Sequence, residues 1–318
     1  MTGLSKKPTN PENDLPFLRA AVLPVDKPVG MTSFDVLRIL KKVFRRVRIG
    51  HAGTLDPAAS GLLLVCFGAA TRLVSWFHTF PKTYRADVLF GVTTDSDDLD
   101  GSVTARNPVP AGLEQLLPAL YDEFRGEIRQ LPPAVSAVKT GGKRAYALVR
   151  AGIAPELRER SVTVFELNER ERGTDCVALE ITCSSGTYIR SIARDMGSRL
   201  GCGACLAGLR RTSLVGYRLE EAWKVSENPA QEDILPFIRP LESCFVPKSS
   251  VALTPEESNR VAHGVLPWSL LPQLGDRGPG PLVLLNPAGQ ILAVIAKEGE
   301  RWQFIVVLPP NEAGGVAG

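Results

Sequence analysis

Segments with the apolar pattern of a β-strand and segments with that of an α-helix follow one another along this chain in irregular order. The run AAVLPVDKPVG at 20–30 predicts a strand that ends in a turn, and TYRADVLFG at 83–91 predicts a strand with alternating apolar side chains. No internal repeat relates the segments to one another. A regular succession of strand and helix would favour a parallel sheet, so the irregular order predicts a mixed-sheet α+β domain.

A helix is predicted from Thr32 to about Arg46, because Thr32 and Asp35 have the spacing of a capping box. Apolar side chains recur every three or four residues and share one face of this helix, namely Val36, Ile39, Leu40 and Val43. Basic side chains share another face, namely Arg38, Lys41, Lys42 and Arg45. We therefore expect one face to lie in the core and the other to be exposed.

Further strands are predicted at 62–67, 161–167 and 176–183, and further helices at 70–80, 111–126 and 189–200, the last ending at Gly201. From about residue 249 the pattern changes to short strands separated by turns, with a loop expected at 273–281. These patterns predict a main domain over 20–245 and a small β-rich domain over 246–310. Residues 1–19 and 311–318 are expected to form flexible tails.

The longest apolar stretch, 61–70, is much shorter than the roughly 20 residues that a membrane-spanning helix needs. The first twenty residues lack the continuous apolar run of a secretion signal, so we expect a cytoplasmic protein without a membrane segment. Its 6 cysteines are then expected to be reduced thiols. Cys202 and Cys205 form a C-x-x-C pair, but a zinc site needs two more well-placed ligands, so we predict no metal.

Basic residues are clustered, although the net charge of +3 does not by itself indicate binding to nucleic acid. One cluster is the run KKVFRRVR at 41–48, and a shorter one is the pair Arg210 and Arg211. Clusters of this kind bind phosphates. The residues that we expect to contact a nucleic-acid backbone are Lys41, Lys42, Arg45, Lys139, Lys143 and Arg144.

The segment GHAGTLDPAASG at 50–61 surrounds one histidine and one aspartate with glycine, proline and small side chains. Glycine permits unusual backbone angles and leaves room for a ligand, so this composition is typical of a tight loop that approaches a ligand closely. An aspartate before proline is also a common start of a turn, which is the alternative interpretation of Asp56. Because the loop directly follows the basic helix, Asp56 is the first candidate for chemistry.

Five sets of segments, in the same order and over about residues 20–225, resemble the motifs of the TruB family of bacterial tRNA pseudouridine synthases. They are VDKPVGMTSFDVL, IGHAGTLDPAASGLLLVCFGAATRL, KTYRADVLFGVTTDSDDLDG, QLPPAVSAVKTGGKRAYALVRAG, and SSGTYIRSIARDMG with GLRRTSLVGYRLEEA. Five motifs in order make chance an inadequate explanation. The resemblance implies a pseudouridine synthase catalytic domain with an insertion at about 128–153 that grips the tRNA arm. The C-terminal domain would be PUA-like and bind RNA.

The resemblance also implies roles for individual residues. Asp56 of GHAGTLD is the catalytic nucleophile, and Arg190 of GTYIRS lies beside it and favours its anionic form. Tyr84 stacks the extruded uracil and helps to move its C5 proton. On the sequence pattern alone, Arg190 would be an exposed helix arginine and Tyr84 a core aromatic. Other substrate contacts implied by motif position are His51, Tyr188 and Leu209.

The implied reaction converts the uridine at position 55 of the tRNA T-loop into pseudouridine. The N1 glycosidic bond breaks, the base turns and its C5 joins the same ribose carbon, so composition is unchanged and no cofactor is expected. A carboxylate can attack covalently, or it can stabilise a cationic sugar while it abstracts a proton. The sequence leaves both routes open. The uridine must first be flipped out of the folded loop.

We expect the T-arm of tRNA as the partner, a monomeric enzyme and no obligatory protein partner. Two alternatives stay open. A non-catalytic tRNA-binding or tRNA-folding module would need the basic residues but not Asp56, and a dyskerin-like synthase would work with a guide RNA and partner proteins. The insertion around 132–152 favours the stand-alone bacterial type. KTGGKRAY lacks the spacing of a P-loop, which argues against a nucleotide-dependent activity.

Overall fold

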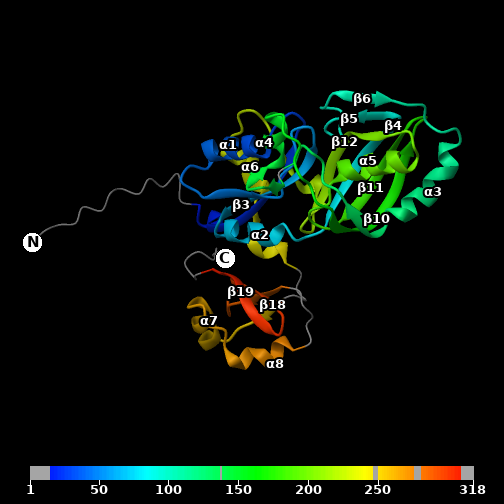
Figure 1. The fold of residues 1–318 in the computed structure, drawn as a ribbon. Helices are drawn as coiled ribbons and strands as arrows, with labels where there is room; N and C mark the ends of the chain where they lie inside the picture. Colours follow the sequence, from blue (N-terminus) through cyan, green and yellow to red (C-terminus); the bar gives the residue numbers. More distant parts are fainter. Residues whose placement is uncertain (1–14, 137, 246–249, 276–280, 309–318) are drawn as a thin grey trace, which may run out of the picture.

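The computed structural model describes residues 15–136, 138–245, 250–275 and 281–308 (Figure 1). Its first elements are the 3₁₀-helix η2 (Pro16–Arg19), strand β1 (Ala20–Lys27), helix α1 (Ser33–Val43), strands β2 (Ile49–Ala52) and β3 (Ser60–Gly68), 3₁₀-helix η3 (Ala69–Leu73) and helix α2 (Val74–Phe77). Residues 1–14 of the expected N-terminal tail lie outside the described part. Leu18 of η2 is already buried.

Helix α1 begins as the sequence predicts. The Asp35 backbone N–H donates to Thr32 Oγ1 at 3.1 Å, and the Thr32 N–H donates to Asp35 Oδ2 at 3.0 Å. The helix ends at Val43 and not at Arg46, which has a positive φ of 64° that no α-helix accommodates. Val36 and Leu40 lie in the core, as the apolar spacing requires.

The helix predicted at 70–80 is wrong in kind, because η3 and a single turn of α2 take its place. Threonine hydroxyls compete with the helical pattern at both ends of this segment: Thr71 donates to the Gly68 carbonyl and Thr79 donates to the Trp76 carbonyl, each at 2.7 Å. The chain then leaves the segment directly into the next strand.

The middle of the chain forms strands β4 (Lys82–Phe90), β5 (Val92–Thr94) and β6 (Val103–Arg106), helix α3 (Leu113–Glu123) and strand β7 (Gly126–Gln130). The expected alternation along β4 is confirmed, because Tyr84, Ala86, Val88 and Phe90 are all buried. The segment at 131–153 contains the two-residue strands β8 (Lys139–Thr140) and β9 (Lys143–Arg144) and helix α4 (Ala145–Arg150).

Strands β10 (Arg160–Arg172) and β11 (Cys176–Cys183) follow, then helix α5 (Ile189–Arg199) and strand β12 (Ala204–Leu214). The sequence does not predict β12, because its segment LRRTS lacks the apolar alternation of a strand. The remaining elements before residue 246 are β13 (Tyr217–Arg218), η4 (Leu219–Glu221), β14 (Trp223–Lys224), α6 (Gln231–Ile234), η5 (Leu235–Phe237), β15 (Arg239–Pro240) and η6 (Leu241–Cys244).

These strands build an 11-stranded mixed sheet with the order β14-β1-β3-β12-β4-β11-β10-β7 and with β2, β13 and β15 beside it. Strand β12 is central. It pairs in parallel with β3, where Arg211 faces Gly61, and antiparallel with β4, where Arg211 faces Tyr84. Gly61 has a φ of 99°, and a Cβ on it would lie 2.3 Å from the Arg211 carbonyl oxygen, so only glycine fits there.

The C-terminal part forms β16 (Ser250–Ala252), α7 (Pro255–Ala262), η8 (Trp268–Leu270), α8 (Leu271–Leu274), β17 (Leu282–Leu285), β18 (Ile291–Glu298) and β19 (Arg301–Val307). Its strands form a 4-stranded sheet. The helices are additions to the β-rich pattern that the sequence predicts, and α7 has a capping box of Thr254 and Glu257. Of the loop expected at 273–281, Gln273 and Leu274 belong to α8, whereas 276–280 and the expected tail at 311–318 lie outside the described residues.

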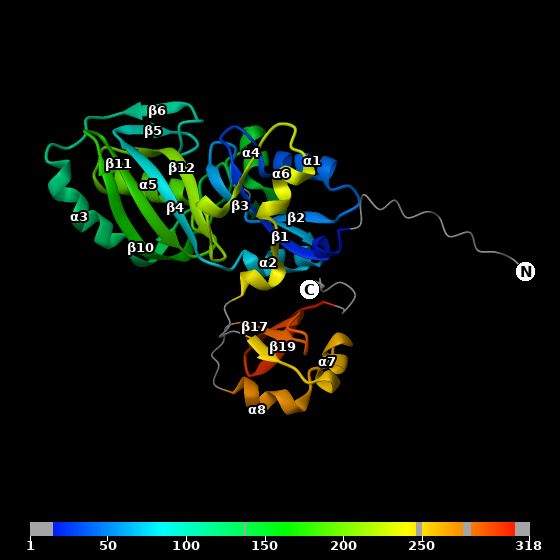
Figure 2. The ribbon, with the colours of Figure 1, turned by 180° about the vertical axis from the view of Figure 1, so that it is seen from behind.

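Two apolar clusters organise the molecule. The larger packs α1, α3 and α5 against the main sheet. The second lies on the opposite side of β1 and β3, includes α2, and receives Val283, Val294 and Val306 from the 4-stranded sheet. The small sheet is therefore attached through its own apolar side chains, and it lies next to α2 in both views (Figures 1 and 2). None of the helices in the described ranges is long and apolar enough to span a membrane.

Candidate functional site

The loop that carries Asp56 lies between β2 and β3. Residues of the motif VDKPVGMTSFDVL bind its backbone. The Leu55 N–H donates to Ser33 Oγ at 3.0 Å, and the Ser33 hydroxyl donates back to the Leu55 carbonyl at 3.2 Å. The Gly30 N–H donates to the Pro57 carbonyl at 2.8 Å. Although both flanks of Asp56 are fixed, its side chain remains 52% exposed. A rigid loop thus presents an accessible carboxylate.

Arg190 holds this carboxylate in one orientation. Its Nη2 donates to Asp56 Oδ2 at 2.8 Å and to the Val135 carbonyl at 3.1 Å, and its Nη1 donates to the Ser96 carbonyl at 3.0 Å. The Arg190 side chain is only 8% exposed and donates to three acceptors, so its orientation is fixed. A guanidinium donates along several fixed directions at once, which lets one residue join the Asp56 loop, the 95–101 loop and the insertion.

Asp98 also faces this arginine, and the sequence gives it no individual role. Its Oδ2 lies 3.5 Å from Arg190 Nη1, and its side chain is 13% exposed. The hydroxyl groups of Thr94 and Ser96 donate to its backbone and side chain. The signal that could have found it is the acidic run DSDDLDG, which the resemblance includes, but the run does not say which carboxylate turns inward.

A cavity of about 480 Å³ opens at this site. Its lining includes Asp56, Arg190 and Asp98 on one side and Leu209 and Arg210 of β12 on another. A cavity of this size is within the range of small-ligand sites and suits a single nucleotide. Leu209 therefore lines the same cavity as Asp56.

Tyr84 is 8% exposed and is absent from the lining of this cavity. Burial raises the pKa of its phenol, and the nearby Arg211 guanidinium opposes that increase; the Asp56 carboxylate adds a smaller upward effect. The Asp56 carboxylate therefore influences the Tyr84 phenol, but other side chains cover the tyrosine ring. A base can stack on it only if the surrounding side chains give way.

Tyr188 and His51 are likewise absent from the cavity lining. Tyr188 precedes α5, where its N–H donates to Gln130 Oε1 at 2.8 Å and the Arg160 guanidinium lies 5.7 Å from its ring centre. His51 is half-buried on β2; burial lowers its pKa, and the positive charges of His78 and Arg211 add to this effect. Its Nδ1 has no hydrogen-bond partner within the described part of the chain. Asp56, Arg190 and Leu209 thus line one cavity, whereas Tyr188 and His51 do not line it.

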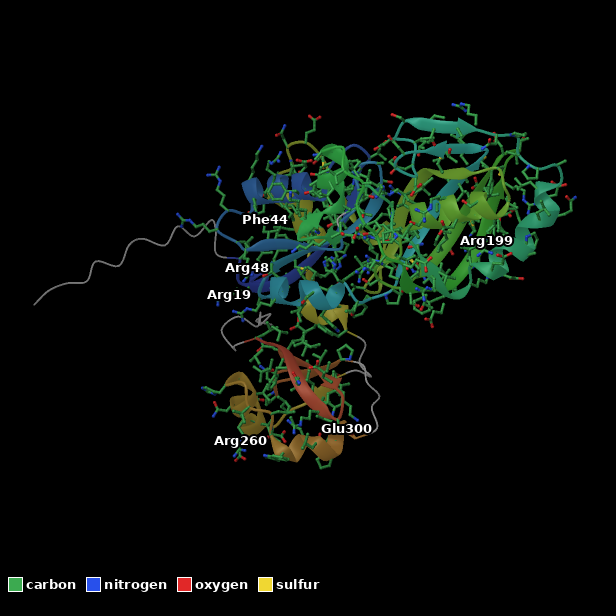
Figure 3. All side chains as sticks on the ribbon, viewed as in Figure 1. Arg19, Phe44, Arg48, Arg199, Arg260 and Glu300 are labelled. Carbon is green, nitrogen blue, oxygen red and sulfur yellow. The ribbon has the colours of Figure 1, made fainter. Side chains whose placement is uncertain are left out.

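The candidate phosphate-binding residues lie on two separate elements. Lys41 and Lys42 are exposed on α1, and Arg45 is exposed just beyond it. Lys139, Lys143 and Arg144 are exposed on the β8–β9 hairpin, which leads into α4. Helices α1 and α4 are neighbours in both ribbon views, and Arg48, from the same basic run, lies at the outer edge of the α1 region (Figures 1, 2 and 3).

Cys202 and Cys205 are both buried at the start of β12, where the Cys202 thiol donates to the Gly203 carbonyl. Over the described ranges, no group of three or more histidine, cysteine, aspartate or glutamate side chains is arranged to hold a metal ion. Three buried cations lie close to the site: Lys27, Lys82 and Arg211. The sequence analysis missed Lys27 and Lys82, and it placed Arg211 in a basic pair expected to bind phosphates, whereas the structure buries this side chain.

Comparisons with known proteins show which family the sequence resembles. The sequence profile of a family described as TruB family pseudouridylate synthase (N terminal domain) matches residues 41–189. A protein of Leifsonia xyli described as tRNA pseudouridine synthase B is 38% identical over 308 residues, which cover 93% of this chain and 99% of that protein. A protein of Mycobacterium tuberculosis with the same description is 36% identical over 296 residues, which cover 91% of this chain and 96% of that protein.

A solved structure has a similar fold. It is described as the crystal structure of a Cbf5-Nop10-Gar1 complex, and the match has a TM-score of 0.66 and 25% identity. It covers 92% of this chain and 85% of that chain. The similarity therefore extends over the main sheet and the small C-terminal sheet together.

Proposed function

The chain belongs to the TruB family of pseudouridylate synthases, and from this premise we propose that it isomerises the uridine at position 55 of the tRNA T-loop to pseudouridine. The observation that carries the proposal is the Asp56–Arg190 pair at the edge of a cavity of nucleotide size. Support for tRNA as substrate comes from relatives described as tRNA pseudouridine synthase B, which this chain matches over almost their whole length.

Asp56 is the proposed nucleophile. Arg190 engages its Oδ2, and no donor to Oδ1 is found in the described part of the chain, so Oδ1 is available to the substrate. Arg190 holds this carboxylate in place, and a carboxylate oxygen is the attacking group in covalent catalysis of this kind. When Asp56 acts, the N1–C1′ bond breaks, the detached base turns, and C5 forms the new bond to C1′.

Tyr84 is proposed to assist the loss of the C5 proton. Burial raises the pKa of its phenol, so the hydroxyl group stays protonated at neutral pH and can pass a proton on only while it accepts another. The side chains that cover its ring must move before the ring can stack on uracil. We propose that the flipped base displaces them as it enters the site. Tyr188, Leu209 and His51 are proposed to border the bound nucleotide.

The energy needed to flip the uridine is a few kcal/mol. Phosphate contacts from α1 and from the β8–β9 hairpin, whose basic residues are exposed, are proposed to offset part of this energy. The segment at 128–153 is the proposed grip on the tRNA arm, and the 4-stranded sheet is the core of a proposed PUA-like RNA-binding domain spanning about 246–310. The enzyme is proposed to work in the cytoplasm as a monomer.

A guide-RNA-dependent synthase is the competing proposal, because the solved structure of similar fold is described as a complex of several proteins. Higher identity and near-complete coverage favour the tRNA pseudouridine synthase B relatives. A binding module without activity is disfavoured by the exposed carboxylate that Arg190 orients, since binding phosphates does not require it.

Tritium release from a tRNA transcript labelled at uridine C5 tests the proposal. The purified chain alone, without added cofactor, guide RNA or protein, is expected to release one equivalent of tritium per tRNA. Replacing the target T-loop uridine with cytidine should abolish the release. No release from the first transcript, or equal release from both, would contradict the proposed substrate.

A further inference from the structure

Arg211 is one of the most deeply buried side chains in the protein, with 1% of its surface exposed. It lies at the centre of the main sheet, where β12 is flanked by β3 and β4 (Figure 1). Across the parallel pair it faces Gly61, which follows the Asp56 loop, and across the antiparallel pair it faces Tyr84. The residue therefore stands between the two segments that carry the proposed chemistry.

The guanidinium of Arg211 is bound to the backbone at both ends of the Asp56 loop. Its Nη2 donates to the Gly53 carbonyl at 2.8 Å, and its Nε donates to the Leu62 carbonyl at 2.6 Å. The contact at Gly53 leaves no spare room, because a Cβ at that position would lie 3.2 Å from Arg211 Nη1 and the residue has a φ of 83°. Burial raises the pKa of the Tyr84 phenol, and the charge of the same guanidinium opposes that increase.

No carboxylate lies within ion-pair distance of Arg211 in the described ranges, so its buried charge is held by neutral groups only. Two other buried cations share this property. Lys27 donates to the Pro28 and Met31 carbonyls, and Lys82 donates to the His78 and Phe80 carbonyls. Burial lowers the pKa of each lysine to about 8, and the charge of Arg211 adds to this effect. For Lys27, the Asp56 carboxylate opposes part of the decrease.

Burying a charge without a counter-ion costs free energy, and apolar side chains of similar volume would pack the same space without that cost. An apolar side chain would leave the Gly53 and Leu62 carbonyls without these donors, so part of the role of Arg211 is structural. Its side chain binds the Asp56 loop, its backbone pairs with that of Tyr84, and its charge has no counter-ion among the described residues. Such a charge would stabilise negative charge that develops nearby.

We propose that Arg211 is a positioning residue of the isomerisation, which fixes the Asp56 loop relative to Tyr84 and supplies permanent positive charge beneath the uracil site. The inference rests on the proposed function. When the N1–C1′ bond breaks, its electron pair leaves with the base, which carries one negative charge until C5 bonds to C1′. The C5 proton then departs and N1 takes up a proton. A positive charge fixed before the reaction stabilises the anionic base without reorganisation.

Two substitutions separate the charge from the geometry. Arg211→Lys keeps the charge but cannot bind the Gly53 and Leu62 carbonyls in the same geometry, whereas Arg211→Met keeps much of the volume and loses both the charge and these bonds. Single-turnover tritium release, tRNA affinity and melting temperature are measured for each. Leu117→Ala, in the buried face of α3, is the control for lost stability, and all rates are taken well below the lowest melting temperature.

Arg211→Met should slow the chemical step about 100-fold or more and Arg211→Lys about 10-fold, with tRNA affinity within a few-fold of wild type. Leu117→Ala should keep the wild-type rate. Rates for the Arg211 variants within a few-fold of wild type would overturn the proposal, as would a loss of rate that Leu117→Ala reproduces. If Arg211→Met does not fold, the same criteria apply to Arg211→Lys. Failure of the proposed function itself is distinguishable, because the wild-type chain would then release no tritium.

Discussion

Arg190 Nη2 lies 2.8 Å from Asp56 Oδ2, although the two residues are 134 positions apart in the sequence. The arginine is almost fully buried and the aspartate is half exposed, so the pair has an asymmetric role. The buried partner sets the orientation, and the exposed partner keeps one oxygen for the substrate. The carboxylate of this salt bridge therefore stays open to the cavity that it lines.

We expect Arg190→Lys to lower the single-turnover rate about 100-fold or more while tRNA affinity stays within a few-fold. A lysine ammonium cannot reach Asp56, the Ser96 carbonyl and the Val135 carbonyl together, so the carboxylate loses its fixed orientation. Arg194→Lys is the matched control, since Arg194 lies one turn further along α5 and pairs with Asp97 and Asp195. Equal losses in the two variants would assign Arg190 to the scaffold.

Substitutions of Tyr84 distinguish a role in chemistry from a role in the core. Tyr84→Phe should keep binding and slow the chemical step strongly, because only the hydroxyl is lost. Tyr84→Leu should also weaken capture of the flipped base, for which stacking contributes roughly 1 to 3 kcal/mol. Rates, affinities and melting temperatures decide between the two roles. A core tyrosine predicts a nearly silent Tyr84→Phe and a less stable Tyr84→Leu.

Folding stability should depend on pH through Lys82. Burial, and then the charge of Arg211, lowers its pKa from 10.5 to about 8. Between these two values the unfolded chain keeps a proton that the folded protein has lost, so the free energy of unfolding rises with pH. Urea unfolding from pH 7.5 to 10 should therefore show wild type gaining stability relative to Lys82→Met. Lys42→Met, at an exposed position on α1, should track wild type, and parallel curves for Lys82→Met would contradict the buried charge.

The basic residues should act on affinity and leave the chemical step unchanged. Lys41→Gln with Lys42→Gln, and Lys139→Gln with Lys143→Gln, should each weaken tRNA binding and reduce the slope of log K against log salt by about one per lost phosphate contact. The rate at saturating tRNA should stay at the wild-type value. Arg170→Gln, which breaks an exposed pair with Glu180, is the control. An unchanged salt slope in a double variant would remove that cluster from the tRNA interface.

Local signals in the sequence predicted the local structure around the site. The capping box of Thr32 and Asp35 fixes the start of α1, and the period-two pattern around Tyr84 fixes the inward face of β4. Both depend on residues a few positions apart, which a sequence displays directly. The resemblance to family motifs supplied what spacing could not, namely that Asp56 and Arg190 belong to one site.

The roles of Arg211 and Asp98 could not be predicted, for a physical reason. An arginine in LRRTS has the pattern of an exposed residue, but it is buried here, where the carbonyl groups of Gly53 and Leu62, about 150 positions away, accept hydrogen bonds from it. Asp98 is one of several carboxylates in its loop, and its contact with Arg190 depends on how that loop folds. Long-range contacts of polar groups leave no periodic trace in a sequence.

Asp56 is the proposed nucleophile, so single-turnover tritium release by Asp56→Asn is the decisive measurement. The substitution preserves the size of the side chain and removes its charge, so the Ser33–Leu55 and Gly30–Pro57 bonds that hold the loop should persist. We expect no detectable tritium release from C5-labelled tRNA, with tRNA affinity within a few-fold of wild type. Release at a rate near that of the wild-type enzyme would contradict it.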